Sequence, residues 1–244
     1  MRAVLNHITE RQNRFAEHLV FDGLQQDGPL EQVLAFAPRL AFWVMSFQDV
    51  LRLNAQRMQD PELAMLMLRH RQEERGHDHW FFEDAAQLMG RPFNLTEPWG
   101  RTHEATRDAS YAILAEAMRP LDDRLRIILV LTLESTSHAF FSRTANLPQT
   151  LSQGQSLKYF SNHHMEAEEQ HEVFEEQMEA MLLGMELPPE LRAEAIALVD
   201  RVYAAFHSMF DGFQTESQRP AVKPEWRPQP AVTSSPALLA SPAR

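Results

Sequence analysis

The sequence predicts an all-α protein, and two observations lead to this fold class. Glycine is scarce, with 8 residues in 244, and the 15 prolines lie mostly between periodic segments or near the C-terminus. Apolar residues recur at helical spacing along most of the chain, and no segment shows the alternation of a half-buried strand. We therefore expect seven helices, several of them with a proline-marked start.

Length and composition limit the domain organisation. A chain of 244 residues with 44% hydrophobic residues can form one large core or at most two small domains. Residues 217–244 hold six of the prolines and end in SSPALLASPAR, a composition typical of disorder. We expect a single helical domain over residues 1–216 and a disordered, proline-rich tail over residues 217–244.

Charge and cysteine content exclude several function classes. A net charge of −11 argues against nucleic acid as a partner, because phosphate binding needs a basic face. The absence of cysteine excludes disulfides, Cys-zinc sites and thiol nucleophiles, so any metal is bound by His, Asp and Glu. No apolar run has the length of a signal peptide core or a membrane span. We expect a soluble, cytoplasmic protein with no membrane partner.

The first two helices are expected at residues 1–21 and 38–58. Asp22-Gly23 ends the first, and Pro38 suits the first turn of the second. The second helix is apolar over most of its circumference, which predicts a central position. Its large apolar residues either pack in the core or line an apolar pocket: Phe42, Trp43, Met45 and Phe47.

The next helices follow from their start and stop signals. Asp60-Pro61-Glu62 predicts an Asp cap with proline in the first turn, and the third helix should run from there to Gly90. A loop to about residue 101 precedes a short fourth helix at 103–118. Pro120 opens a fifth helix that ends before Pro148. The sixth and seventh helices are expected at 152–184 and from about 188 to 215.

The sixth helix carries His164, Glu168 and His171 at positions i, i+4 and i+7. A helix advances by about 100° per residue, so these side chains fall within roughly 60° of one another. Two imidazoles and a carboxylate on one face form a ligand set for a divalent metal. The alternative is a solvated acidic helix with scattered histidines.

Two further helices offer matching side chains. In the third helix, Glu74 and His77 are three residues apart and share a face, while His70 and Glu73 lie on the same side, so the choice between Glu73 and Glu74 stays open. In the fifth helix, Glu134 follows a run of apolar residues. A buried lone carboxylate is costly, so this residue needs either a metal or an ion-pair partner.

Together these helices supply three carboxylates and three imidazoles: Glu74, His77, Glu134, His164, Glu168 and His171. Three carboxylates offset most of the charge of two ferrous ions, and helical bundles build di-iron sites from carboxylates and Glu-x-x-His pairs. Zinc needs fewer ligands. The set predicts two metal ions, or one ion with open positions.

The residues around these ligands resemble a known family. EERGHDHWFFEDAAQLMG resembles a signature of the heme-oxygenase-like iron-containing redox enzymes, and HHMEAEEQH resembles their second motif, with Glu168 where aspartate is commoner. Glu134 falls where that family carries its middle glutamate. The resemblance covers roughly residues 30 to 215. It implies a seven-helix heme-oxygenase-like bundle, a non-heme site for two Fe(II) ions, and O₂-dependent oxidation of a small organic substrate by hydroxylation, N-oxygenation, desaturation or cleavage.

Related folds provide alternatives. Some family members carry a further carboxylate ahead of the Glu-x-x-His helix, where this chain offers only Asp49. Heme oxygenase itself uses an N-terminal histidine, for which His18 is the candidate here. Thiaminase II needs a cysteine that this chain lacks, and key residues of pyrroloquinoline-quinone synthase are not evident. Ferritin-like arylamine N-oxygenases have nearly the same ligand spacing on a four-helix bundle.

Several residues near the predicted ligands have two possible roles. His138, one turn after Glu134, either orients a ligand or is an ordinary buried histidine. Arg126 and Arg143 either anchor a substrate carboxylate or pair with acids. Surface or supporting positions are expected for His79, Glu83 and Asp84.

Two functions of different classes fit these features. The first is an iron-dependent oxidase or oxygenase whose partners are O₂ and a small molecule, with an electron donor and a second copy of the chain as open additions. The second is a non-catalytic helical protein that binds a metal or another protein.

Overall fold

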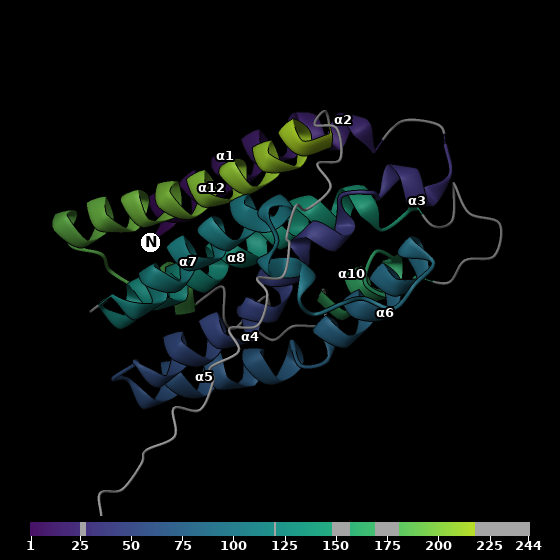
Figure 1. Cartoon of the computed structure of the whole chain (residues 1–244). Coiled ribbons are helices and arrows are strands. Elements are labelled where there is room, and N and C mark those ends of the chain that lie inside the picture. The colour runs from purple at the N-terminus through teal and green to yellow at the C-terminus, as the bar shows by residue number, and fades with distance from the viewer. Residues whose placement is uncertain (25–27, 120, 148–156, 169–180, 218–244) are drawn as a thin grey trace, which may run out of the picture.

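A computed structural model describes residues 1–24, 28–119, 121–147, 157–168 and 181–217 (Figure 1). The described residues form α-helices and short 3-10 helices and contain no strand, which confirms the all-α class. The expected tail over residues 217–244 lies, apart from its first residue, outside the described part of the chain. None of the described helices is long and apolar enough to cross a membrane.

The N-terminal third contains α1 (Arg2–Ala16), α2 (Leu19–Gly23), α3 (Leu30–Val33), the 3-10 helix η1 (Ala37–Leu40) and α4 (Ala41–Gln56). The expected single helix over residues 1–21 is wrong, because the chain is extended at His18, with φ −65° and ψ 137°. The His18 imidazole accepts a hydrogen bond from the Val20 N–H and lies 3.2 Å from Asp211. His18 thereby caps α2, and both of its ring nitrogens are engaged.

The expected third helix over residues 60–90 is in fact two helices, α5 (Pro61–Glu73) and α6 (His77–Met89). Its ends are as predicted: Asp60 accepts hydrogen bonds from two N–H groups of the first turn, and Gly90 is left-handed with φ 63°. Between the two helices, Gly76 has φ 102°. Only glycine adopts this conformation without strain, and it separates α6 from α5.

The middle of the chain contains η2 (Glu97–Trp99), η3 (Arg101–His103), α7 (Glu104–Met118) and α8 (Asp123–Thr144). The last begins behind an Asp122 cap rather than at Pro120. The buried guanidinium of Arg126 donates to the carbonyls of Ala117 and Arg119 at the end of α7. It therefore caps α7 and joins it to α8 instead of pairing with an acid or facing a substrate.

The C-terminal part contains α10 (Asn162–Glu168) and α12 (Pro189–Ser217). Residues 157–161 form a bend and turn, so the expected helix from residue 152 is wrong at this point, and helical structure begins at Asn162.

The helices pack around α8, whose residues from Leu125 to Thr136 are all buried. In Figure 1, α12 runs along α1 on one side of the bundle, while α4 and α5 lie on the other. Buried apolar residues from Val4 to Phe213 form one hydrophobic cluster, so both ends of the described chain contribute to the same core. Burial of α8 on all sides makes it the element that carries polar side chains deepest into the protein.

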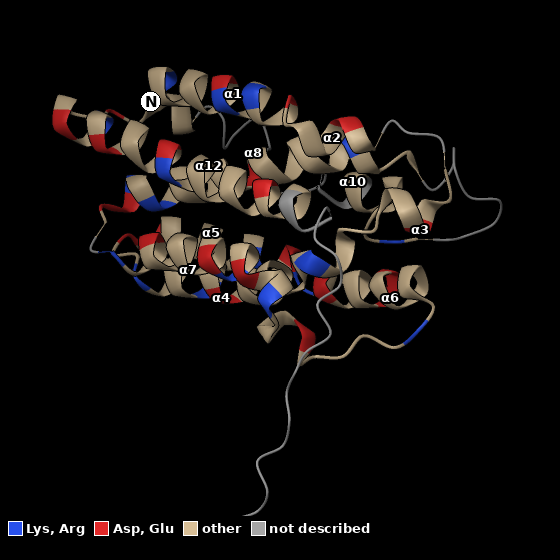
Figure 2. Cartoon of the chain, turned by 45° about the horizontal axis from the view of Figure 1, so that its top comes forward, with Lys and Arg blue, Asp and Glu red and all other residues tan. Residues whose placement is uncertain are grey.

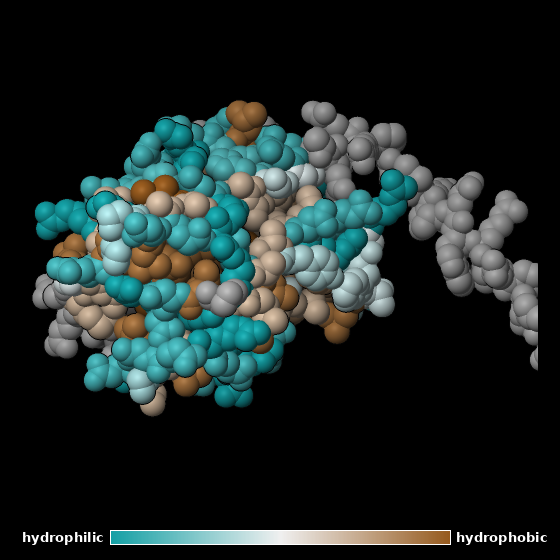
Figure 3. All heavy atoms as spheres, turned by 90° about the vertical axis from the view of Figure 1, so that its left-hand side faces the viewer, coloured by the Kyte–Doolittle hydropathy of each residue, from teal (hydrophilic) through white to brown (hydrophobic). Residues whose placement is uncertain are grey.

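The surface carries charges of both signs (Figure 2). Acidic and basic residues are interspersed along the outer helices α1, α7 and α12 (Figure 2). From one end of the bundle, hydrophobic residues appear as patches among hydrophilic ones (Figure 3).

Candidate metal centre

Five histidine and glutamate side chains from four helices meet inside the bundle. Their exposed fractions are 0% for His70, 4% for Glu74, 7% for His77, 2% for Glu134 and 2% for His164. His70 and Glu74 come from the last turn and the end of α5, and His77 from the start of α6. Glu134 comes from the middle of α8, and His164 from α10. Burial of so many ionisable groups at one place requires that they compensate one another.

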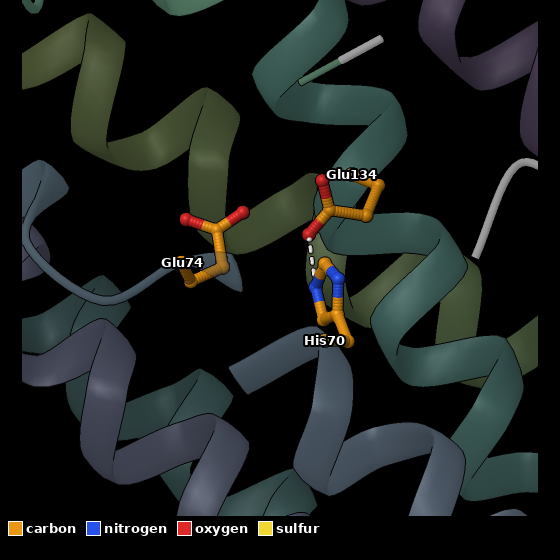
Figure 4. Close-up of side chains that lie close together, drawn as sticks. All are labelled: His70, Glu74 and Glu134. Atoms are coloured by element: carbon orange, nitrogen blue, oxygen red, sulfur yellow. Dashed lines mark hydrogen bonds and ion pairs between the residues drawn. The ribbon is translucent and has the colours of Figure 1, made fainter. Parts of the chain in front are cut away.

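His70, Glu74 and Glu134 form the first half of the cluster (Figure 4). Each offers one ligand atom, and these atoms all lie within 4.8 Å of one another. The His70 Nε2 atom is 2.9 Å from an Oε1 oxygen of Glu134. In the close-up the carboxyl group of Glu74 stands beside this pair, from the end of α5. The spacing is small enough for one cation to contact all three side chains.

The pKa of His70 reflects this arrangement. Burial would lower the pKa, but the charge of Glu134 and its hydrogen bond, helped by Glu73 and Glu74, raise it well above its ordinary range. The neighbouring carboxylates therefore favour the protonated form of His70, whose charge would balance that of a buried carboxylate. A metal that binds Glu134 competes with this proton.

Glu74, His77 and His164 form the second half. The His77 Nδ1 atom is 2.9 Å from an oxygen of Glu74 and 3.2 Å from the His164 Nε2 atom. The His77 and His164 rings meet with centroids 4.5 Å apart. Glu74 belongs to both halves, so the five side chains form one continuous cluster.

The loop before α10 orients His164. The carbonyl of Tyr159 lies 2.9 Å from His164 Nδ1, so Nδ1 carries the hydrogen and donates it, which leaves a lone pair on Nε2 toward His77. Asp84 of α6 holds this loop, because its buried carboxylate accepts hydrogen bonds from the N–H groups of Lys158 and Phe160. Burial raises the pKa of Asp84, and these backbone hydrogen bonds oppose that rise.

Aromatic rings enclose the imidazoles. Trp80 stacks on His77 with centroids 4.6 Å apart, and Phe141 lies 3.9 Å from His164 by the same measure. A cavity of about 30 Å³ lies against Glu74, His77 and His164, with room for one or two water molecules. A second cavity of about 30 Å³ lies among apolar residues of α1, α8 and α12, and the two share the following wall residues: Trp43, Ser137, Phe141 and Tyr159.

The structure brings four of the six sequence-predicted ligands together: Glu74, His77, Glu134 and His164. For Glu168 the structure describes the backbone at the end of α10, and His171 lies outside the described residues. Glu74 is buried in the cluster, whereas the side chain of Glu73 is 25% exposed and 3.9 Å from His70 Nδ1.

His70 is the residue that the sequence argument did not assign, although it precedes Glu74 by four residues on the same face. That spacing was the available signal. The ligand role of each of these residues stays a prediction.

Other expectations are corrected. Asp49 is 62% exposed and pairs with Arg52, so it is not a further buried carboxylate. His138 and Arg143 are exposed, which excludes the buried roles considered for His138. Among the large apolar residues of α4, Trp43 and Phe47 line the cavity beside the cluster, whereas Phe42 is buried and Met45 is 41% exposed.

Comparison with known proteins adds no family assignment. No family model matches the sequence, and a search of curated proteins finds no significant match.

Proposed function

We propose that the protein is an iron-dependent oxidoreductase that uses O₂ to oxidise a small organic substrate at this cluster. The observation that supports the proposal is the convergence of His70, Glu74, His77, Glu134 and His164 in a buried, aromatic-walled site. The heme-oxygenase-like fold and the di-iron centre implied by the sequence resemblance belong to this proposal.

The chemical types of the ligand side chains suit iron. The set consists of imidazoles and carboxylates, which suit ferrous iron, and it has no thiolate. Glu74 belongs to both halves of the cluster, so it would hold cations together with His70 and Glu134 on one side and with His77 and His164 on the other. Glu168 and His171, which the sequence predicts on the same helical face as His164, would complete the set. Bound ferrous iron would supply the electrons that activate O₂.

The protein's own residues have three tasks in this proposal. The carboxylates and imidazoles would bind the cations. In each histidine, the hydrogen bond made by one ring nitrogen would decide whether the other nitrogen carries a proton or offers a lone pair to a cation. Trp80 and Phe141 orient the imidazoles and exclude bulk water. The small cavity beside Glu74 and His164 admits a molecule the size of O₂, while the adjoining apolar cavity keeps that side of the site dry.

Anaerobic titration with Fe(II) tests the proposal. Wild-type protein should bind two ions per chain, and subsequent O₂ should produce a transient visible absorption band. His164→Ala should lose at least one of the two ions, because its Nε2 lone pair faces the cluster. His79→Ala is the matched control, since His79 is 81% exposed and lies two residues from His77.

Three results would contradict this assignment. Unchanged iron uptake in His164→Ala would refute the site. A colourless bound ion that does not react with O₂ would favour the non-catalytic metal-binding function. Absence of iron binding in wild-type protein would refute the proposal as a whole.

A further inference from the structure

A groove of about 730 Å³ lies on the outer side of the break between α5 and α6. Its volume is within the range of small-molecule sites. Its lining is mostly polar: Gln48, Leu68, Arg71, Gln72, Arg75, Gly76, Asp78 and His79. Gln48 and Asp78 also line the cavity beside Glu74, His77 and His164. The groove and the metal-side cavity are therefore neighbours across the Gly76 break.

Arg71 and Arg75 give the groove its charge. Arg71 lies in the last turn of α5 and Arg75 in the turn that follows it, and both line the groove. Neither guanidinium forms an ion pair with an acidic side chain in the described part of the chain, and the Arg71 Nε atom is buried without a hydrogen-bond partner there.

Within the described residues, two other arginines, unlike Arg71 and Arg75, form ion pairs with acidic side chains. Arg91 pairs with Glu97 at 2.6 Å, and Arg201 pairs with Glu116 at 2.7 Å. In a chain with a net charge of −11, acidic partners are abundant. Two groove arginines without an acidic partner in the described part of the chain keep N–H donors available to a ligand in the groove. A planar guanidinium binds carboxylate and phosphate oxygens with two hydrogen bonds.

The single acid of the groove does not cancel this charge. Asp78 lies where the groove meets the metal-side cavity, because it lines both. Arg71 and Arg75 line the groove but not the metal-side cavity. An anionic group held by Arg71 and Arg75 would therefore leave the rest of a ligand near Gln48 and Asp78, at the boundary of the metal-side cavity.

We infer that the groove is an anion-binding subsite, in which Arg71 and Arg75 hold a carboxylate or phosphate group of a small organic ligand. Identification of that ligand as the substrate rests on the proposed function, whereas anion binding itself does not. The subsite would hold the anionic end of the substrate in the groove, on the outer side of the Gly76 break. That end would then lie away from the buried carboxyl groups of Glu74 and Glu134.

The test uses the full chain without metal and two probes, inorganic phosphate and benzoate, in isothermal titration calorimetry. Wild-type protein should bind at least one probe saturably at one site, and added salt should weaken the binding. The double variant R71Q/R75Q should bind at least about tenfold more weakly, because charge-assisted hydrogen bonds are lost. The preferred probe distinguishes a phosphate ligand from a carboxylate one.

Controls separate the groove from the metal centre. R192Q changes an exposed arginine on α12 and should leave the affinity unchanged. R71Q/R75Q should bind Fe(II) with wild-type stoichiometry, which shows that it is folded; if it does not fold, R71Q and R75Q singly should each weaken binding. Absence of saturable binding to both probes, or wild-type affinity in the variants, would overturn the inference. Iron titration of wild-type protein tests the proposed function independently.

Discussion

At the scale of single residues, the cluster is a set of buried charges that compensate one another in pairs. His70 lies against Glu134 and His77 against Glu74, at 2.9 Å in both cases. A buried carboxylate whose partner is removed costs several kcal/mol, on the order of 3–5. The hydrogen bonds of these histidines therefore satisfy the two buried carboxyl groups in this structure.

His70 provides the first prediction. Its pKa is raised well above the ordinary value of 6.5, so it holds its proton more tightly than a free imidazole, and this proton must leave when a cation binds both His70 and Glu134. Metal affinity should rise with pH in the range above 6.5, by about tenfold per pH unit for each proton displaced. Calorimetry in buffers of different ionisation enthalpy should show that His70→Gln releases about one proton fewer than wild type.

An equal number of released protons in both proteins would contradict the role of His70. His138→Gln is the control, since His138 is exposed on the same helix as Glu134 and should not change proton release.

At the scale of elements, two local features position the ligands. The Gly76 break places Glu74 at the end of α5 and His77 at the start of α6, so the Glu-x-x-His pair does not lie on one continuous helix face. The Asp84 carboxylate joins α6 to the loop before α10 through the Lys158 and Phe160 N–H groups. That loop presents the Tyr159 carbonyl to His164.

Asp84→Ala provides the second prediction. Loss of the acceptor leaves buried N–H groups without their partner, which should lower the free energy of unfolding by about 2 kcal/mol. His164 should also lose its fixed orientation, so metal affinity should fall by roughly tenfold or more. Urea denaturation and metal titration measure the two effects.

Glu83→Ala serves as the matched control for this prediction. Glu83 pairs with Lys158 at the surface and should contribute less than about 1 kcal/mol. If both variants behave alike, Asp84 does not hold the loop.

At the scale of the whole molecule, the bundle is closed by contacts between helices far apart in sequence. Glu116 of α7 accepts hydrogen bonds from Arg119 and from Arg201 of α12. Gly212 of α12 lies so close to α7 that an added Cβ would overlap the Cβ of Ala105. The two helices therefore pack closely at one point and are joined by charge at another.

The Glu116 network provides the third prediction. Burial would raise the pKa of Glu116, but Arg201 and Arg119 lower it below the ordinary value of 4.5. Because the folded carboxyl binds protons less tightly than the unfolded one, its contribution to stability is complete above pH 4.5 and is lost as the pH falls through its lowered pKa. Wild-type protein should therefore lose stability more steeply than Glu116→Gln between about pH 5 and about pH 3.

Urea midpoints over this pH range measure the difference. Glu10→Gln is the control, because the Glu10–Arg14 pair lies on the exposed face of α1 and contributes little. Equal pH dependence in wild type and Glu116→Gln would refute a stabilising role for the network.

The sequence by itself determined the features that depend on local chemistry. Helix periodicity and scarce glycine indicated the all-α class, and the Asp60 cap and Gly90 stop were visible because capping involves residues a few positions apart. The spacing of Glu74 and His77, and of His164 and Glu168, predicted that each pair shares a helix face. The Gly76 break divides the first pair, and the side chain of Glu168 lies outside the described part of the structure.

Only the tertiary structure decided which of these residues meet. Glu74 rather than Glu73 is buried in the cluster, and His70 joins it. Asp49 and His138 lie outside the cluster. Each of these outcomes depends on which face of a helix is packed against its neighbours. The break at Gly76 was equally hidden, because a glycine within a helical pattern is tolerated unless packing requires a positive φ. Burial and long-range contact are properties of the assembled bundle, and a local pattern does not contain them.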